Sequence, residues 1–345
     1  MNDMHGDEMR NKLKTALALG LFLAGAGVAT ASTLDDVKAR GTLICGTNPA
    51  TAGFSMPDNN GNWTGFVVDY CRAVAAAVLG DPAKVQFIPL ESKDRFTALQ
   101  SGEIDILAHN ATWTSSRDAS LGILFAGVYF YDGQGFMVHQ DGPTEAAGLD
   151  GASICVSQGT TSELNIADYF RTHGMTYEAV GFANEIDELK AFEQGRCDVY
   201  SADTSSLNAA RLQMADPAAS VVLQDIISKE PLGPVVRQGD DGWLNIAKWT
   251  LFALVSAEEF GVTSANVEEM TASDNPNIRR LLGAEGTFGK DLGLADDWAA
   301  SIVKAVGNYG EMFERNIGAS SPLGIKRGAN ALWNAGGLQY APPIR

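Results

Sequence analysis

The first part of the chain switches between the apolar pattern of a buried strand and that of an amphipathic helix. A strand is predicted for TLICG at 42–46, and a loop rich in Gly, Asn, Asp and Pro follows it. A helix is predicted for the next segment, because apolar residues recur there at i, i+3, i+4 and i+7, at Cys71, Val74, Ala75 and Val78. The pattern therefore indicates a β-loop-α unit.

Strand and helix patterns continue to alternate along the following segments. Further strands are predicted at 85–90 (VQFIPL) and 103–107 (EIDIL), with a helical segment between them. A second α/β set begins after the acidic, glycine-rich stretch at 141–152, with strands at 153–157 and 197–203. This alternation predicts an α/β protein with mainly parallel sheets.

Two extended segments, at 127–139 and 227–243, flank the second α/β set. Two crossings around a compact inserted part are typical of two lobes joined by a two-strand hinge. We therefore expect a two-lobe α/β fold with a helical C-terminal extension, which either braces the first lobe or forms a contact between copies. The expected boundaries give a first lobe of 32–137 and 233–345, and a second lobe of 138–232.

The N-terminus has the three parts of a secretory signal peptide. Basic residues precede the apolar run ALALGLFLAGAGVA, which is too short and too rich in small residues for a membrane span, and Ala-Thr-Ala at 29–31 suits cleavage. We predict a signal peptide at 1–31, cleavage after Ala31 and export to the periplasm. Since Met9 directly precedes the basic residues, translation starts at Met1 or at Met9.

Composition and charge mainly exclude partners. The chain has 345 residues, 45% of them hydrophobic, so it can bury a large core. Its formal net charge of −17 would repel nucleic acids and anionic lipid surfaces. No segment after residue 31 is apolar over the length that a membrane helix needs. We expect no nucleic-acid partner, no direct membrane insertion, and membrane contact only through another protein.

Four cysteines make an even count in an exported chain, which permits disulfides. Cys45 ends the first strand and Cys71 lies on the apolar face of the next helix, whereas Cys155 and Cys197 each lie in a strand of the second set. Of the three pairings, we favour Cys45–Cys71 and Cys155–Cys197. Buried free thiols are the alternative, because spacing in sequence does not give the separation of the Cα atoms.

The stretch EIDILAHNATWTSSR at 103–117 carries candidate ligand groups. Small molecules bind beyond the carboxyl ends of strands in open α/β sheets, and Asn110, Thr112 and Arg117 follow this strand. The Arg117 guanidinium suits a carboxylate, Thr112 adds a hydroxyl, and Asn110 offers acceptors for an ammonium. The alternative is that Arg117 is a solvated residue of a helix that begins at Ser115.

Two further polar segments follow strands of the second set, and one lies in the first loop. QGTTSE at 158–163 has the spacing of a capping box, in which Thr160 caps a helix whose free N–H groups could bind an anion. Asp203, at the end of the strand at 197–203, suits an ammonium or, alternatively, caps the next helix. Phe54, in the first loop, would pack against a ligand side chain or plug the core.

These groups together predict a binding site for a zwitterion between the lobes. Its carboxylate would meet a set of donors, which are Arg117, Thr112, Thr160 and Thr161. Its ammonium would meet Asp203 and Asn110, and satisfying both sets requires the lobes to close. Motifs of serine hydrolases, phosphate-binding loops, zinc peptidases and dinucleotide enzymes are absent, and the four histidines lack metal-ligand spacing. We therefore expect no enzyme activity, no metal and no cofactor.

On these motifs the chain resembles the family 3 periplasmic solute-binding proteins, which serve ABC transporters for polar amino acids. The resemblance over residues 41–240 rests on the helix GFVVDYCRAVA and on LQSGEIDIL, TWTSSR, QGTTSE, CDVYSAD and LGPVVRQGD. Beyond residue 240, the segments WTLFALVSAEEFGVTSANVEEM, VGNYGEMFERNIG and GANALWNAGGLQYAPPI resemble the general L-amino-acid-binding branch of the Aap type. The resemblance implies the type II periplasmic-binding-protein fold.

The resemblance also implies the same division of the site, with the ligand carboxylate on Arg117 and Thr112 and the ammonium on Asp203. Binders of basic amino acids in this family carry an acid where this chain has Asn48, and an aromatic residue near the position of Ser92. Asn48 is therefore expected beside the ligand side chain. A lysine or arginine ligand would lack its usual counter-charge.

These expectations favour a non-enzymatic periplasmic receptor that captures L-amino acids, with broad specificity for neutral and acidic polar ones. It would deliver them to a membrane ABC permease and would act as a monomer. Two alternatives are a lyase or dehydratase on the same fold and an amino-acid chemosensory receptor. The lyase would need a further catalytic acid that faces the cleft.

Overall fold

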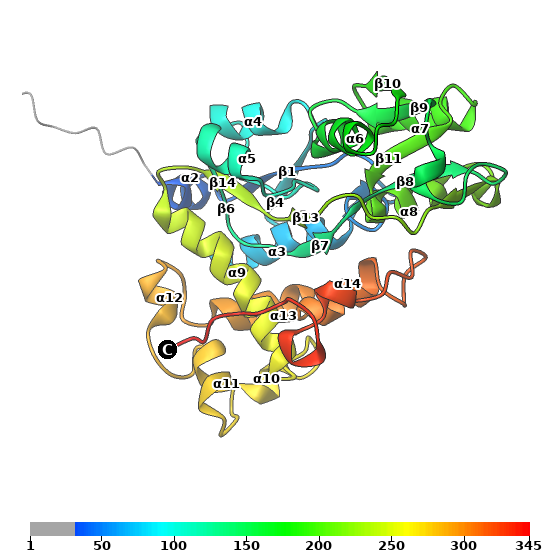
Figure 1. Ribbon diagram of the computed structural model, residues 1–345. Coiled ribbons are helices and arrows are strands. Elements are labelled where there is room, and N and C mark those ends of the chain that lie inside the picture. Colours follow the sequence, from blue (N-terminus) through cyan, green and yellow to red (C-terminus); the bar gives the residue numbers. More distant parts are fainter. Residues whose placement is uncertain (1–31) are drawn as a thin grey trace, which may run out of the picture. The chain divides into compact units, whose positions relative to one another are not determined.

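The computed structural model describes residues 32–345, and the predicted signal peptide, its cleavage site and both candidate start residues lie outside the described residues. Within this range the chain forms two five-stranded sheets with helices packed around them, and a helical C-terminal part (Figure 1). None of the helices between residues 32 and 345 combines the length and the apolar character needed to cross a membrane.

The first sheet contains the three strands predicted in the first α/β set and two more. Its strands are β1 (Leu43–Thr47), β4 (Val85–Pro89), β5 (Ile106–Leu107), β6 (Ile123–Phe125) and β14 (Val235–Arg237). In the order β4-β1-β5-β14-β6, β1 is parallel to β4 and β5, whereas β14 from the return segment pairs antiparallel with β5 and β6. We call this sheet and its helices the first lobe.

The helices of the first lobe include the predicted amphipathic one. They are α2 (Thr33–Arg40), α3 (Phe66–Leu79), α4 (Arg95–Ser101) and α5 (Ser115–Ser120), and the first loop holds the hairpin β2 (Met56–Pro57) and β3 (Trp63–Thr64). Helix α3 buries the predicted apolar face. It ends at Gly80, whose φ of 65° and N–H bond to the Ala76 carbonyl form a left-handed cap.

The second sheet forms the core of the second lobe. Its strands are β8 (Gln134–His139), β9 (Ala152–Ser157), β10 (Tyr177–Phe182), β11 (Val199–Asp203) and β12 (Ser220–Val222). Its helices are η1 (Ala146–Gly148), α6 (Thr161–Thr172), α7 (Glu185–Glu193), α8 (Thr204–Gln213) and η2 (Pro217–Ala219). In the order β10-β9-β11-β8-β12, β9 is parallel to both neighbours, whereas β8 is antiparallel to β11 and β12.

A two-stranded sheet links the lobes. Strand β7 (Phe130–Asp132) pairs antiparallel with β13 (Glu230–Leu232), so the two chain crossings run side by side. The expected boundary at 137/138 falls inside β8, which pairs entirely within the second sheet. The predicted single crossing is divided at Gly133, where an added Cβ would lie 2.4 Å from Cγ2 of Ile226. We therefore propose that the lobe boundaries lie at β7 and β13.

Both favoured disulfides are present, and all four cysteines of the described chain are paired. Cys45 in β1 bonds to Cys71 in α3, across 26 residues, and Cys155 in β9 bonds to Cys197 just before β11, across 42 residues. The prediction of the pairing is confirmed. Each bond ties a strand of one sheet to a segment of the same lobe, so the lobes are cross-linked separately.

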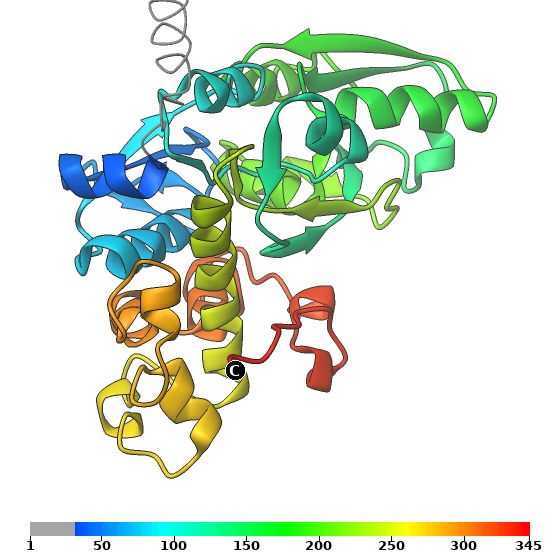
Figure 2. The ribbon, with the colours of Figure 1, turned by 90° about the vertical axis from the view of Figure 1, so that its left-hand side faces the viewer.

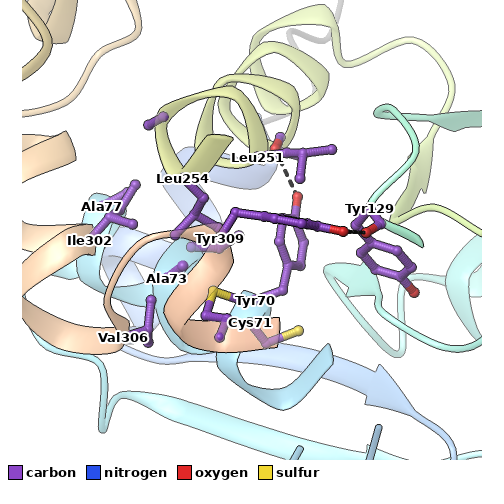
Figure 3. Close-up of a cluster of buried hydrophobic side chains, with 14 of the residues drawn as sticks. Tyr70, Cys71, Ala73, Ala77, Tyr129, Leu251, Leu254, Ile302, Val306 and Tyr309 are labelled. Carbon is purple, nitrogen blue, oxygen red and sulfur yellow. Dashed lines mark hydrogen bonds between the residues drawn. The ribbon is translucent and has the colours of Figure 1, made fainter. Parts of the chain in front are cut away.

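The C-terminal helices pack on the first lobe. They are α9 (Asp241–Glu259), α10 (Val267–Met270), α11 (Pro276–Leu281), α12 (Phe288–Asp291), α13 (Trp298–Val306), α14 (Tyr309–Asn316), η3 (Gly328–Asn330) and η4 (Trp333–Ala335). Helices α3, α9, α13 and α14 share one buried cluster, and α9 runs from the first lobe into the C-terminal part (Figures 1 and 2). Tyr70 donates to the Ala247 carbonyl at 2.7 Å, and Tyr309 donates to the Tyr129 carbonyl at 2.8 Å (Figure 3). These contacts support the bracing role.

Candidate functional site

A pocket lies between the lobes at the carboxyl ends of three strands. Strand β5 leads to Asn110 and Thr112, β9 leads to Thr160 and Thr161, and Asp203 is the last residue of β11. These five predicted residues all line the pocket. Polar loops that are far apart in the sequence therefore meet at one place, as the rule for ligand sites in α/β sheets predicts.

Three other predicted residues do not line the pocket. Phe54 is fully buried, and its ring packs edge to face against that of Phe130, with the centroids 5.3 Å apart. The structure therefore makes Phe54 a core residue. Arg117 and Asn48 lie instead at contacts between the two lobes.

Helix α6 begins at the pocket. Thr160 is its N-cap and accepts the N–H of Glu163 at 3.3 Å, as the capping-box spacing predicts, while Glu163 accepts the N–H of Gly159 at 3.2 Å. Gly159 has a φ of 74°, and a Cβ there would lie 3.0 Å from the Cα of Lys93 in the first lobe, so glycine suits this close approach. The free N–H groups of the first turn and the helix dipole form an anion site on the pocket wall.

Arg117 joins the lobes through two carbonyl groups. Its guanidinium donates to the Thr112 carbonyl at 2.9 Å and to the Gly159 carbonyl of the second lobe at 3.5 Å. Burial lowers the pKa of Arg117, while the nearby Glu230 and Asp203 carboxylates act in the opposite direction. The alternative of a solvated Arg117 is wrong, because this residue is buried.

Glu230, in the hinge strand β13, is a central residue that the sequence did not predict. One carboxylate oxygen accepts the Thr112 hydroxyl at 2.5 Å and the Thr161 hydroxyl at 3.0 Å, one from each lobe. The other accepts the Asn165 amide at 2.7 Å and the Ser228 hydroxyl. Each threonine hydroxyl has one proton, and the Glu230 carboxylate is the strongest acceptor within its reach. The hydroxyl oxygens of Thr112 and Thr161 therefore present only lone pairs to the pocket. The sequence signal was an acid within the predicted return crossing.

Asp203 lies in the pocket wall, and no described residue donates a hydrogen bond to its carboxylate. It occupies the N-cap position of α8, but its side chain forms no cap bond. Burial raises the pKa of Asp203 well above its ordinary value, and the Asp132 and Glu230 carboxylates add to this effect. Burial also raises the pKa of Asp132 to about 6, although Asp132 accepts the N–H groups of Gly133 and Ser205. Asp203 is therefore a buried carboxyl group without a donor from the described chain, and a cation beside it would favour its ionised form.

Arg95, the first residue of α4, is a second site residue that the sequence did not predict. Its Nη1 lies 2.9 Å from Nδ1 of His109 and 3.4 Å from the Asn110 carbonyl oxygen. His109 Nε2 lies 3.0 Å from the Leu90 carbonyl, so Nε2 carries the proton, and burial lowers the pKa of this ring well below its ordinary value. Burial lowers the pKa of Arg95 to about 9, so the guanidinium is charged at neutral pH.

Glu185, the first residue of α7, brings a carboxylate to the pocket from the second lobe. It accepts the Asn48 amide at 2.7 Å and the Thr51 hydroxyl at 3.3 Å, both from the first lobe. Burial raises the pKa of Glu185. The pocket therefore contains an acidic side chain although residue 48 is a neutral Asn, because Glu185 comes from the opposite lobe.

The pocket continues into a second compartment of the cleft. Glu185, Tyr200 and Ser206 line both parts. Small and apolar side chains of α7 and α8, among them Leu189 and Ala210, line the second part. The cleft therefore offers space beyond the groups that would hold an α-amino acid.

The pocket is suited to binding small polar groups. Between residues 32 and 345, no group of His, Cys, Asp and Glu side chains has an arrangement that could hold a metal ion. The His109 ring is already bonded on both nitrogens, to Arg95 and Leu90. The charged groups left for a ligand are Asp203, Arg95 and Glu185, together with the first turn of α6.

Comparison with known proteins gives a consistent family. Residues 43–265 match the model of the bacterial extracellular solute-binding proteins, family 3. The chain is 56% identical to the general L-amino acid-binding periplasmic protein AapJ of Rhizobium johnstonii, over 98% of this chain and 100% of that protein. It is 55% identical to the glutamate/glutamine/aspartate/asparagine-binding protein BztA of Rhodobacter capsulatus, over 96% and 98%. A solved periplasmic binding protein of an ABC transporter from Brucella ovis, with glutathione bound, is 58% identical and has a TM-score of 0.90, over 92% of this chain and 100% of that one.

Proposed function

Because this chain belongs to the bacterial extracellular solute-binding proteins of family 3, we propose that it is the periplasmic substrate-binding component of an ABC importer for L-amino acids. The observation that carries this proposal is Asp203, a buried carboxylate without a hydrogen-bond partner on the wall of the pocket at which α6 begins. A zwitterion supplies both missing partners, an ammonium for the carboxylate and a carboxylate for the helix N-terminus.

The ligand ammonium would lie on Asp203. The buried Oδ1 of Asn110, which has no hydrogen-bond partner in the described chain, is a second acceptor for it. The Thr112 hydroxyl is a third, because Glu230 takes its proton. This orientation assigns Thr112 to the ammonium, whereas the sequence favoured the carboxylate.

The ligand carboxylate would lie at the first turn of α6, where Thr161 and Ser162 line the pocket. Arg117 has five N–H donors and uses two of its nitrogens for carbonyl groups, so it adds positive charge and spare donors beside this turn. Since each set combines groups from both lobes, Asn110, Thr112 and Arg117 from the first and Asp203 and α6 from the second, ligand binding would favour the closed state.

Export would follow from the expected signal peptide at 1–31 with cleavage after Ala31. The mature chain would act as a monomer and would deliver its ligand to a membrane permease, which recognises the closed lobes. The contact between Glu185 and Asn48 is one of those that closure forms, because it joins the lobes across the cleft.

One observation favours a second ligand for the same receptor. The related Brucella ovis protein holds glutathione, and the pocket of this chain continues past Tyr200 into the second compartment. We propose that glutathione binds through its α-amino-acid group in the first part of the pocket, with the rest of the tripeptide in the second part.

The test is calorimetric titration of the refolded, ligand-stripped mature protein with L-glutamine, L-glutamate, L-alanine, L-arginine and glutathione. Wild type should bind several amino acids, and Arg117→Ala should weaken all of them about 100-fold, as expected for a charged hydrogen-bonding group. Arg171→Met, an exposed substitution on α6, is the matched control.

Failure of wild type to bind any amino acid would overturn the proposal. Turnover of prephenate or arogenate by the same preparation would favour the lyase or dehydratase. Capture of a chemoreceptor without a permease in a pull-down from membranes would favour the sensory alternative.

A further inference from the structure

Two side chains of opposite charge, the buried Arg95 and the half-buried Glu185, line the pocket without pairing with each other. Arg95 is 2% exposed, Glu185 faces it from the other lobe, and each influences the other electrostatically. Neither forms an ion pair with any residue between 32 and 345: the polar partners of Arg95 are His109 and the Asn110 carbonyl, and those of Glu185 are neutral side chains.

Both charges have hydrogen-bonding capacity left. Arg95 Nε has no hydrogen-bond partner in the described chain, although the guanidinium can donate five bonds. Glu185 accepts two hydrogen bonds, and a carboxylate has about four lone-pair sites. A buried charge without a counter-ion is costly, so a ligand group that completes either one gains affinity.

We propose that Arg95 and Glu185 form an amphoteric subsite that selects the ligand side chain. This inference rests on the proposed function, because it takes the α-amino-acid group as bound at Asp203. A primary amide, as in glutamine or asparagine, offers its carbonyl to Arg95 and its NH₂ group to Glu185. A side-chain carboxylate satisfies Arg95 alone, and a side-chain cation satisfies Glu185 alone.

The surrounding charges leave this division intact. Asp203 and Asp132 lie with Glu230 at the hinge end of the pocket, and Asp203 is reserved for the α-ammonium. Lys190 and Glu193 line the second compartment and are exposed, so solvent screens them. The subsite therefore accepts acidic, amide and basic side chains, which extends the expected neutral and acidic range to arginine and lysine.

The test compares ligand preference in Glu185→Gln and Arg95→Met, titrated with L-glutamate, L-glutamine and L-arginine. Glu185→Gln should weaken L-arginine about tenfold or more while L-glutamate binds as well as before or better. Arg95→Met should weaken L-glutamate by a similar factor while L-arginine binds as well as before or better. The matched controls are Glu178→Gln and Arg171→Met, both exposed and outside the pocket.

The ratio of the affinities for L-arginine and L-glutamate should fall in Glu185→Gln and rise in Arg95→Met. These opposite changes distinguish a role in specificity from a structural role. Equal loss for all three ligands, or no change, would overturn the subsite and leave the proposed function standing. Absence of amino-acid binding in wild type would overturn both. Since Arg95 also holds His109 and the Asn110 carbonyl, its variants are first checked by thermal melting, and Glu185→Gln decides alone if Arg95→Met does not fold.

Discussion

The hinge end of the pocket and its side-chain end use buried charge differently. At the hinge end, Glu230 receives four hydrogen bonds, from Thr112, Thr161, Asn165 and Ser228. At the side-chain end, Arg95 and Glu185 keep unused capacity and do not pair with each other. Both ends join the lobes, yet Glu230 receives donors from the protein at both carboxylate oxygens, whereas Arg95 and Glu185 keep hydrogen-bonding capacity for a ligand.

This difference distinguishes groups that fix the geometry of the pocket from groups that select the ligand side chain. A carboxylate with all its partners supplied by the protein fixes the rotamers of the groups around it and stabilises one geometry. A charge without a counter-ion in the protein gains one only from the ligand. Its contribution to the binding affinity therefore depends on the chemical group that the ligand places beside it. Changes at the hinge end should therefore affect all amino acids alike, and changes at the side-chain end should affect them unequally.

The largest effect is expected for Asp203→Asn. The variant removes the charge that faces the ligand ammonium and offers an NH₂ donor in its place, so every amino acid should lose about 100-fold or more in affinity. Calorimetric titration with L-glutamine, L-glutamate and L-arginine measures this. Asp187→Asn, an exposed substitution on α7, is the control.

A weaker and uniform effect is expected for Glu230→Gln. The neutral amide keeps one oxygen acceptor but replaces the other oxygen by an NH₂ donor. It therefore binds the protons of the Thr112 and Thr161 hydroxyls less strongly, and these hydroxyls are less firmly fixed as acceptors for the ligand. Affinity should fall about tenfold for each amino acid, with their ratios unchanged. Titration beside Glu178→Gln checks this result, and a change in the ratios would show that Glu230 takes part in selection.

Much of this architecture could be predicted from the sequence. Strand periodicity located the loops that carry Asn110, Thr112 and Asp203, because ligands bind at the carboxyl ends of strands. The capping-box spacing located Thr160 at the start of α6. The disulfide pairing followed from assigning the cysteines to strands and helices within one lobe.

The charges that act across the cleft could not be predicted. Arg95 and Glu185 each begin a helix, where a charged residue usually faces solvent, and their role depends on the opposite lobe. The role of Glu230 depends on the position of β13 beside the loop at Thr112. No local sequence pattern predicts that contact. The break between β7 and β8 at Gly133 was not predicted for a similar reason, since the close approach of Ile226 to Gly133 comes from a distant segment.

The smallest expected effect is release of part of a proton when an amino acid binds. In the empty pocket burial raises the pKa of Asp203, so some of this carboxyl is protonated, and a bound ammonium favours the ionised form. Affinity should therefore rise with pH and level off once the empty pocket is ionised. Asp132 makes the folding stability depend on pH in a separate way. Because burial raises its pKa to about 6, the folded chain binds this proton more tightly than the unfolded chain does. The resulting contribution to stability is present below about pH 4 and is lost as pH rises through about 6.

Calorimetry in two buffers of different ionisation enthalpy, between about pH 5 and 8, measures the released proton. Asp203→Asn should release none, and because that variant binds weakly it is titrated at high ligand concentration. Unchanged proton release in Asp132→Asn would assign the proton to Asp203. Zero release by wild type at every pH would mean that no carboxyl changes its ionisation when the ligand binds, which would contradict an ammonium bound at the hinge end.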